Sequence, residues 1–120
     1  MAKILVVDDD TAVRTFVTRA LHQHGHAVVP AANGDDALAV LARERDVVLL
    51  VTDIVMPGMD GIELAQAATA RRPDLKVLLM TGFAAGRTQA DASAHGLLSK
   101  PFSLVTVCAT VDDLLRGNGG

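Results

Sequence analysis

Three acidic side chains follow apolar runs of the chain and could do chemistry together. Asp8 and Asp9 come after the run at residues 4–7, and Asp53 closes the longer run at residues 47–52. A carboxylate can act as a nucleophile toward a phosphoryl group, and several carboxylates together can bind a hard divalent cation. Both chemistries require a fold that brings these acids to one place.

Two more polar side chains follow later apolar runs. Thr81 comes after residues 76–80, and Lys100 comes after residues 97–99 and precedes Pro101. A threonine hydroxyl can form a hydrogen bond with a phosphoryl oxygen, and a lysine ammonium can neutralise charge on a phosphoryl group. Together with the three carboxylates, these groups would provide the chemistry of phosphoryl transfer.

The elements that must position these residues alternate between apolar runs and amphipathic stretches. We predict strands at residues 4–7, 26–30, 47–52, 76–80 and 97–99, and helices at 11–24, 35–45, 61–70, 87–95 and 103–116. Consecutive strand–helix units predict an α/β fold: a doubly wound, five-stranded parallel sheet with flavodoxin-like order 2-1-3-4-5 and helices on both faces. Functional groups in such sheets gather outside the carboxyl ends of the strands, so we expect the acids, the threonine and the lysine at one edge.

Three carboxylates at one edge repel one another. At an effective dielectric constant near 20, two unit charges about 4 Å apart cost roughly 4 kcal/mol. Lys100 offers one positive charge, and a hard divalent cation with oxygen ligands would supply the rest; Mg²⁺ is the usual cytosolic choice. The sequence therefore predicts a Mg²⁺ site, with Asp53 as a candidate nucleophile.

The composition describes one small domain. The chain has 120 residues, of which 50% are hydrophobic, and a formal net charge of −3. We find no basic stripe, signal peptide or membrane span, so neither nucleic acid nor a membrane is an expected partner. The single cysteine, Cys108, excludes an internal disulfide, favours a cytoplasmic protein and is expected in the core. We expect a domain over residues 1–116 and a flexible tail or linker stub over 117–120.

Four motifs occur in order along the chain: ILVVDDD, VTDIVMPGMDG, LLMTGFA and LLSKPF. Together they closely resemble the receiver domain of two-component response regulators, in the chemotaxis-regulator-like superfamily, over essentially the whole chain. The resemblance implies that Asp53 accepts a phosphoryl group from a histidine kinase or a histidine phosphotransfer protein and so switches a protein-binding surface. It also implies a signalling domain rather than a turnover enzyme, one that assists its own phosphorylation and dephosphorylation.

The resemblance also implies a metal-ligand set. Asp8, Asp9 and Asp53 would form the acidic pocket for Mg²⁺. Asp9 and Asp53 would be direct ligands, and the backbone carbonyl of Val55 would be a third. Asp10 is instead expected to cap the first helix.

The remaining site residues have roles in phosphoryl contact and switching. The resemblance assigns Lys100 to the phosphoryl group, Pro101 to the geometry of its loop, often through a cis peptide bond, and Thr81 to the switch. Receivers commonly have tyrosine or phenylalanine three residues before this lysine, and here that position is Leu97. Phe83 is a candidate substitute. We predict that the loop after Thr81 and the helix that follows carry the signal.

The neighbours of the expected phosphorylation site bear on the lifetime of the phosphorylated state. Val55 and Phe83 flank this site, and neither carries an acid or amide that would orient an attacking water. We therefore predict slower self-dephosphorylation than in receivers with polar groups at these positions.

Other functions stay open as alternatives. The main one is a docking module with the receiver fold but without phosphorylation, against which the complete set of site residues argues. An aspartyl-phosphate phosphatase would need a second acid where the chain has Val55, and a flavodoxin-like cofactor binder would need a Ser-, Thr- or Gly-rich loop after the first strand. The domain is either free-standing or cut from a hybrid kinase, and either a monomer or a weak homodimer with Val105 as a candidate contact.

The histidines of the motif HQHGH, residues 22–26, are not expected to bind a metal. Gly25 interrupts the helix between them, so their side chains need not share a face. A metal-ligand role is therefore the disfavoured interpretation of this motif.

Overall fold

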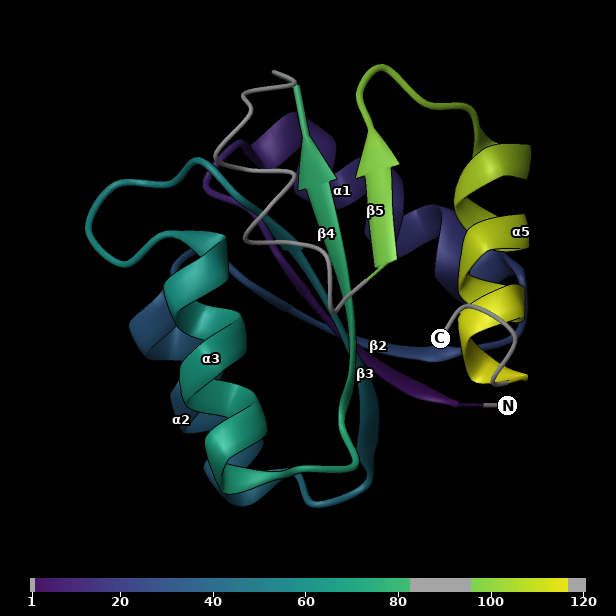
Figure 1. The fold of residues 1–120 in the computed structure, drawn as a ribbon. Coiled ribbons are helices and arrows are strands. Elements are labelled where there is room, and N and C mark those ends of the chain that lie inside the picture. The colour runs from purple at the N-terminus through teal and green to yellow at the C-terminus, as the bar shows by residue number, and fades with distance from the viewer. Residues whose placement is uncertain (1, 83–95, 117–120) are drawn as a thin grey trace.

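The structure is a computed structural model, and it describes residues 2–82 and 96–116. These residues form a parallel five-stranded sheet in the predicted order β2-β1-β3-β4-β5 (Figure 1). The strands are β1 (Lys3–Val7), β2 (Ala27–Ala31), β3 (Val47–Asp53), β4 (Lys76–Thr81) and β5 (Gly96–Ser99). The helices are α1 (Thr11–Gln23), α2 (Gly34–Arg43), α3 (Gly61–Arg71) and α5 (Leu104–Leu115). The predicted helix at 87–95, Phe83 and the tail at 117–120 lie outside the described residues.

Some element ends match the predicted ends and the others differ by one or two residues, for which helix α2 illustrates the reason. It begins at Gly34, one residue before the predicted start, because the Asn33 side chain accepts a hydrogen bond from the Asp36 backbone N–H at 2.8 Å. Such a capping bond fixes where a helix begins, whereas hydrophobic spacing indicates only its middle. The helix ends at Arg43, two residues before the predicted end.

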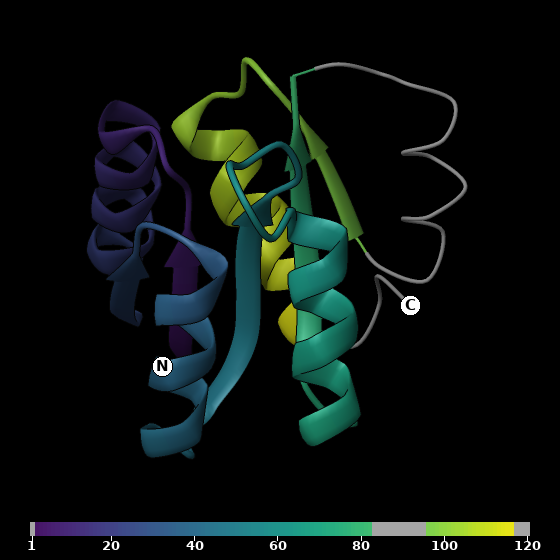
Figure 2. The same ribbon diagram turned by 90° about the vertical axis from the view of Figure 1, so that its left-hand side faces the viewer.

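Helices cover both faces of the sheet. Helices α2 and α3 pack against one face and α1 and α5 against the other, so the core has two layers (Figures 1 and 2). Successive residues of β1 alternate between these layers: Leu5 and Val7 pack with α2 and α3, and Ile4 and Val6 pack with α1 and α5. Because β1, β3 and β4 are buried on both sides, their sequences are continuous apolar runs.

The register of the strands brings the polar residues to the same level. Val7 of β1 pairs with Thr52 of β3, so Asp8, directly after β1, lies at the same level as Asp53, the last residue of β3. Asp53 pairs in turn with Met80, the residue before Thr81. All of these residues lie at the carboxyl edge of the sheet, as the strand order predicted.

The last helix packs its cysteine against α1. Cys108 is 8% exposed, and its Sγ lies 3.7 Å from the Ala20 carbonyl oxygen, which confirms the expected core position. Within the described part of the chain, no helix is both long enough and apolar enough to cross a lipid bilayer.

Candidate functional site

The three predicted carboxylates meet at the carboxyl edge of the sheet. Asp8 is completely buried, Asp53 is 7% exposed and Asp9 is exposed. One carboxylate oxygen from each residue lies within 4.8 Å of the others, a spacing that a single metal ion can bridge. The donor set of three carboxylates fits Mg²⁺, which prefers oxygen ligands.

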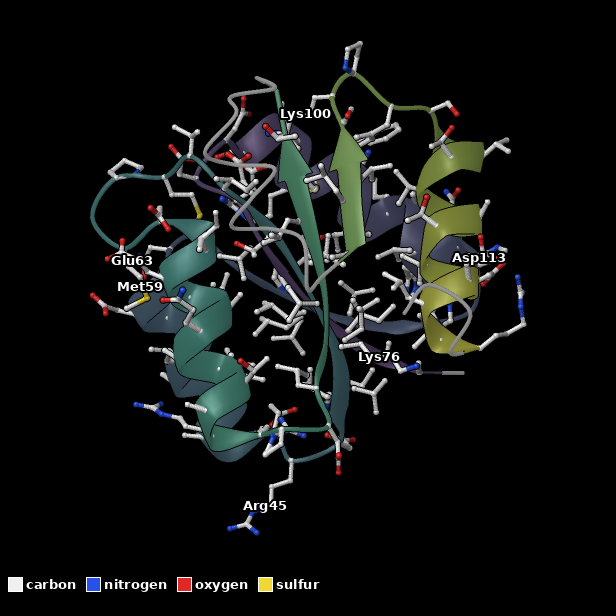
Figure 3. All side chains as sticks on the ribbon, in the orientation of Figure 1. Arg45, Met59, Glu63, Lys76, Lys100 and Asp113 are labelled. Atoms are coloured by element: carbon white, nitrogen blue, oxygen red, sulfur yellow. The ribbon has the colours of Figure 1, made fainter. Side chains whose placement is uncertain are left out.

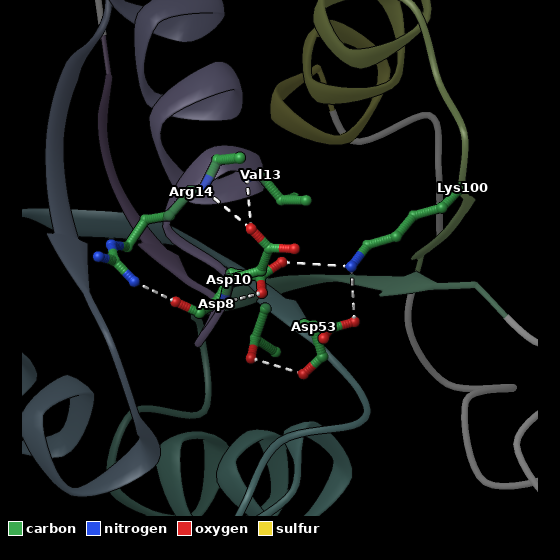
Figure 4. A network of polar contacts seen from close by, with 8 residues as sticks. Asp8, Asp10, Val13, Arg14, Asp53 and Lys100 are labelled. Atoms are coloured by element: carbon green, nitrogen blue, oxygen red, sulfur yellow. Dashed lines mark hydrogen bonds and ion pairs between the residues drawn. The ribbon is translucent and has the colours of Figure 1, made fainter.

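Helix α1 fixes the position of Asp8. The backbone N–H of Asp10 donates a hydrogen bond to Asp8 Oδ1 at 2.9 Å, and the Arg14 guanidinium donates one to the Asp8 carbonyl oxygen at 2.6 Å (Figure 4). The side chain of Asp10 accepts hydrogen bonds from the N–H groups of Ala12 and Val13 and so caps the helix, as predicted. The first turn of α1 and the acidic pocket are therefore one hydrogen-bonded unit.

Lys100 bridges two of the acids. Its Nζ lies 3.1 Å from Asp53 Oδ1 and 3.3 Å from Asp8 Oδ2 (Figure 4). Its backbone N–H donates to the Thr81 carbonyl at 2.7 Å, which holds the end of β5 beside the end of β4. Lys100 lies at the carboxyl edge of the sheet, and Arg45, in the loop before β3, lies at the opposite end of the molecule (Figure 3). The peptide bond from Lys100 to Pro101 is cis, as the resemblance implied.

The backbone after Asp53 is held tightly. The Ile54 N–H donates to the Met80 carbonyl at 3.0 Å, and the Gly61 N–H donates to the Ile54 carbonyl at 2.8 Å. A Cβ at Gly61 would lie 2.1 Å from the Asp53 carbonyl oxygen, so only glycine allows α3 to begin this close to the end of β3. Gly61 was not among the residues predicted for the site. Its position directly after an aspartate cap was the available signal.

The charges of the pocket shift the pKa values of its groups. Burial raises the pKa of Asp53, the negative charges of Asp8 and Asp9 raise it further, and Lys100 lowers it without cancelling the rise. Burial alone would lower the pKa of Lys100, but its hydrogen bond to Asp53 and the charges of Asp53 and Asp8 outweigh burial and raise it. Lys100 is therefore positively charged at neutral pH. Its single charge does not balance the three carboxylates of the pocket.

The other predicted residues lie around this pocket. Thr81 ends β4 and is buried, and Pro101 is exposed in the loop after Lys100. Val55 lies two residues after the end of β3, and it is 63% exposed. Leu97 is 39% exposed on β5, where it pairs with a residue of β4 two positions before Thr81.

The histidine motif departs from the expectation. His24 and His26 lie together with Asp112 of α5, and a ligand atom from each lies within 4.8 Å of the others. Gly25 has a φ of +99°, a left-handed conformation that closes α1 and lets the His26 N–H donate to the Leu21 carbonyl at 3.1 Å. The interrupting glycine therefore brings these two side chains together instead of separating them.

Comparison with known proteins identifies the family. The family described as response regulator receiver domain matches residues 4–112. The chain belongs to this family. It is a receiver domain of two-component response regulators, a class of signalling domain, and its fold and acidic cluster agree with that membership.

Relatives of this receiver differ in length. The response regulator receiver protein CpdR of Brucella abortus (strain 2308) is 43% identical over 118 residues, which cover 96% of this chain and 98% of CpdR. The sensor kinase CckA of the same strain is 39% identical over 96% of this chain, but the match covers only 13% of CckA. The response regulator TrrA of Thermotoga maritima, solved in complex with Mg²⁺-BeF, is 30% identical with a TM-score of 0.86, over 95% of this chain and 99% of TrrA.

Proposed function

We propose that Asp53 is the residue of this receiver that accepts a phosphoryl group. The different contacts and exposure of Asp8 and Asp53, the two buried acids, support this assignment. Both carboxylate oxygens of Asp8 accept hydrogen bonds, from the Asp10 N–H and from Lys100, and its side chain is 0% exposed. The Asp53 side chain is 10% exposed and lies at the end of the central strand β3, so an incoming donor can reach it.

The transfer itself is a displacement at phosphorus. An oxygen of the ionised Asp53 attacks the phosphorus atom, the bond to the donor breaks, and the donor leaves with the electron pair. The Lys100 ammonium neutralises charge on the phosphoryl oxygens, and the Thr81 hydroxyl forms a hydrogen bond with one of them. Attack of water on the same phosphorus releases phosphate and regenerates the carboxylate, so the domain assists its own phosphorylation and dephosphorylation without being a turnover enzyme.

We infer that the acidic pocket holds Mg²⁺. Asp9, Asp53 and the backbone carbonyl of Val55 would be direct ligands, with Asp8 beside them. When bound, the ion supplies positive charge and a coordination position for a phosphoryl oxygen. The excess of negative charge in the pocket supports this inference, as does the Mg²⁺-BeF complex of the related TrrA.

The proposed donor is a histidine kinase or a histidine phosphotransfer protein. A receiver-like segment within the sensor kinase CckA supports this choice of partner. The cytoplasm, which offers both Mg²⁺ and such a donor, is the proposed setting. The phosphorylated domain then acts by protein contact, as a monomer or a weak homodimer, through the loop after Thr81 and the face that includes Leu97. It works either as a free-standing regulator or as part of a hybrid kinase.

The experiment is intact-protein mass spectrometry after incubation with acetyl phosphate and Mg²⁺. We expect the wild type to gain one phosphoryl group, and we expect no gain without Mg²⁺ or in Asp53→Asn. Asp74→Asn, which changes an exposed loop carboxylate, is the matched control and should behave as the wild type. Phosphorylation of Asp53→Asn would refute the assignment of the acceptor. A wild type that gains nothing, even from a phosphorylated kinase, would favour the unphosphorylated docking module.

A further inference from the structure

A second group of metal-ligating side chains lies at the other end of α1. The helix begins after Asp10, beside the acidic pocket, and its 13 residues extend about 20 Å to His24. There His24, His26 and Asp112 bring two imidazoles and one carboxylate together, with ligand atoms within 4.8 Å of one another. These residues come from three elements: the end of α1, the start of β2 and the second half of α5.

We propose that His24, His26 and Asp112 bind a divalent transition-metal ion of the zinc class. Imidazole nitrogens are good ligands for such ions, whereas Mg²⁺ prefers oxygen alone. Three protein ligands leave a fourth, tetrahedral position for water, which is the arrangement of an open zinc site. This inference is independent of the proposed function, because it uses no residue of the acidic pocket.

The His24 ring nitrogen Nε2 and the Asp112 carboxylate are already within hydrogen-bond distance of each other. His24 Nε2 lies 2.9 Å from Asp112 Oδ2 and 3.1 Å from Oδ1. A proton shared by these atoms holds them together, and a metal ion would take its place. The side chains of His24 and Asp112 are 41% and 35% exposed, so an ion has access from solvent.

A buried nitrogen atom of His26 without a hydrogen-bond partner among the described residues supports metal binding at this group. This atom is Nε2 of the imidazole ring. A buried polar atom without a partner is unfavourable, and coordination of a metal would satisfy it.

Metal binding has one structural cost. The Ala2 backbone N–H donates a hydrogen bond to His26 Nδ1 at 3.2 Å, so the ring proton of the neutral ring is on Nε2. Coordination through Nε2 moves that proton to Nδ1, and two N–H groups would then face each other. The Ala2 hydrogen bond would therefore break, and its loss is a local effect of metal binding that can be measured.

The test is calorimetric titration of the full chain with Zn²⁺. We expect His24→Gln and Asp112→Asn each to weaken one binding event at least about tenfold. His22→Gln, which changes an exposed histidine of the same helix outside the group, should bind as the wild type. Asp53→Asn identifies any Zn²⁺ that enters the acidic pocket, and it should leave this binding event in place. Because the side chains of His24 and Asp112 contact each other at a partly exposed site outside the core, both variants are expected to fold.

A second readout follows the protein rather than the ion. We expect Zn²⁺ to shift the amide resonance of Ala2 in the wild type and to leave it unchanged in His24→Gln. Equal Zn²⁺ affinity of the wild type and His24→Gln would overturn the proposal. So would a comparable loss in His22→Gln, or a wild type whose Zn²⁺ binding disappears entirely in Asp53→Asn.

Discussion

Replacement of Asp53 by asparagine is expected to stabilise the metal-free domain. Asp8 and Asp9 each present an oxygen within 4.8 Å of Asp53, and at an effective dielectric constant near 20 each repulsion is about 3.5 kcal/mol. The attraction of Lys100, 3.1 Å away, is about 5 kcal/mol on the same scale. The repulsions therefore exceed the attraction by about 2 kcal/mol, and solvent around the exposed Asp9 reduces this excess. We expect Asp53→Asn to raise the free energy of unfolding by about 1–2 kcal/mol.

The sign of the pH dependence follows from the raised pKa of Asp53. Its pKa in the folded state lies above its ordinary value of 3.8, so the native state binds a proton more readily than the unfolded chain does. The stability from this group is present below the ordinary pKa and is lost as the pH rises through the folded pKa. The advantage of Asp53→Asn should therefore be full at neutral pH and should vanish when the carboxyl group is protonated in both states.

The assay is equilibrium unfolding in urea with EDTA, at about pH 7 and about pH 3.5. Added Mg²⁺ should narrow the difference at neutral pH, because it neutralises the pocket of the wild type. The control Asp74→Asn changes an exposed carboxylate and should stay within about 0.5 kcal/mol of the wild type. An Asp53→Asn variant that is less stable than the wild type at neutral pH, or whose advantage persists at low pH, would refute the electrostatic reasoning.

Three further predictions concern the residues around the pocket. Gly61→Ala should lower the free energy of unfolding by about 3 kcal/mol or more, because its Cβ would clash with the Asp53 carbonyl at 2.1 Å. Gly82→Ala, whose Cβ would meet a Lys100 side-chain carbon at 4.0 Å and no closer atom of the described residues, should unfold as the wild type in the same urea titration. Lys100→Met should reduce the rate of phosphorylation by acetyl phosphate about tenfold or more, and an unchanged rate would exclude its role in charge neutralisation. Val55→Asn should shorten the lifetime of the phosphorylated protein, measured by mass against time, whereas Val55→Ala should leave it unchanged.

The acidic pocket could be predicted because its residues lie at or just after the carboxyl ends of the strands. Strands that are covered on both faces are continuous apolar runs, so their carboxyl ends are visible in the sequence. Parallel order then brings these ends to one edge, where Asp8, Asp53 and Lys100 meet as predicted. The family motifs added roles to these positions, and those roles await the experiments above.

Features that depend on three-dimensional packing could not be predicted in the same way. His24 and Asp112 are 88 residues apart in sequence, and only the packing of α5 on α1 brings them together. The Gly25 turn was interpreted as an interruption because its left-handed φ, which folds the chain back, is a property of the folded backbone. Similarly, the contact between Gly61 and the Asp53 carbonyl depends on the angle at which α3 meets the sheet.

The repulsion in the pocket would also be the source of its affinity for the proposed Mg²⁺ ion. Asp8 cannot turn away from the other acids, because Asp10 and Arg14 hold it on α1, and Asp53 is fixed at the end of a central strand. The two core layers hold these groups together against their mutual repulsion. A cation that entered the pocket would relieve that repulsion. A pocket of mobile acids would instead relax in the absence of metal and would bind the ion more weakly, so the rigid frame is what makes the charge available for chemistry.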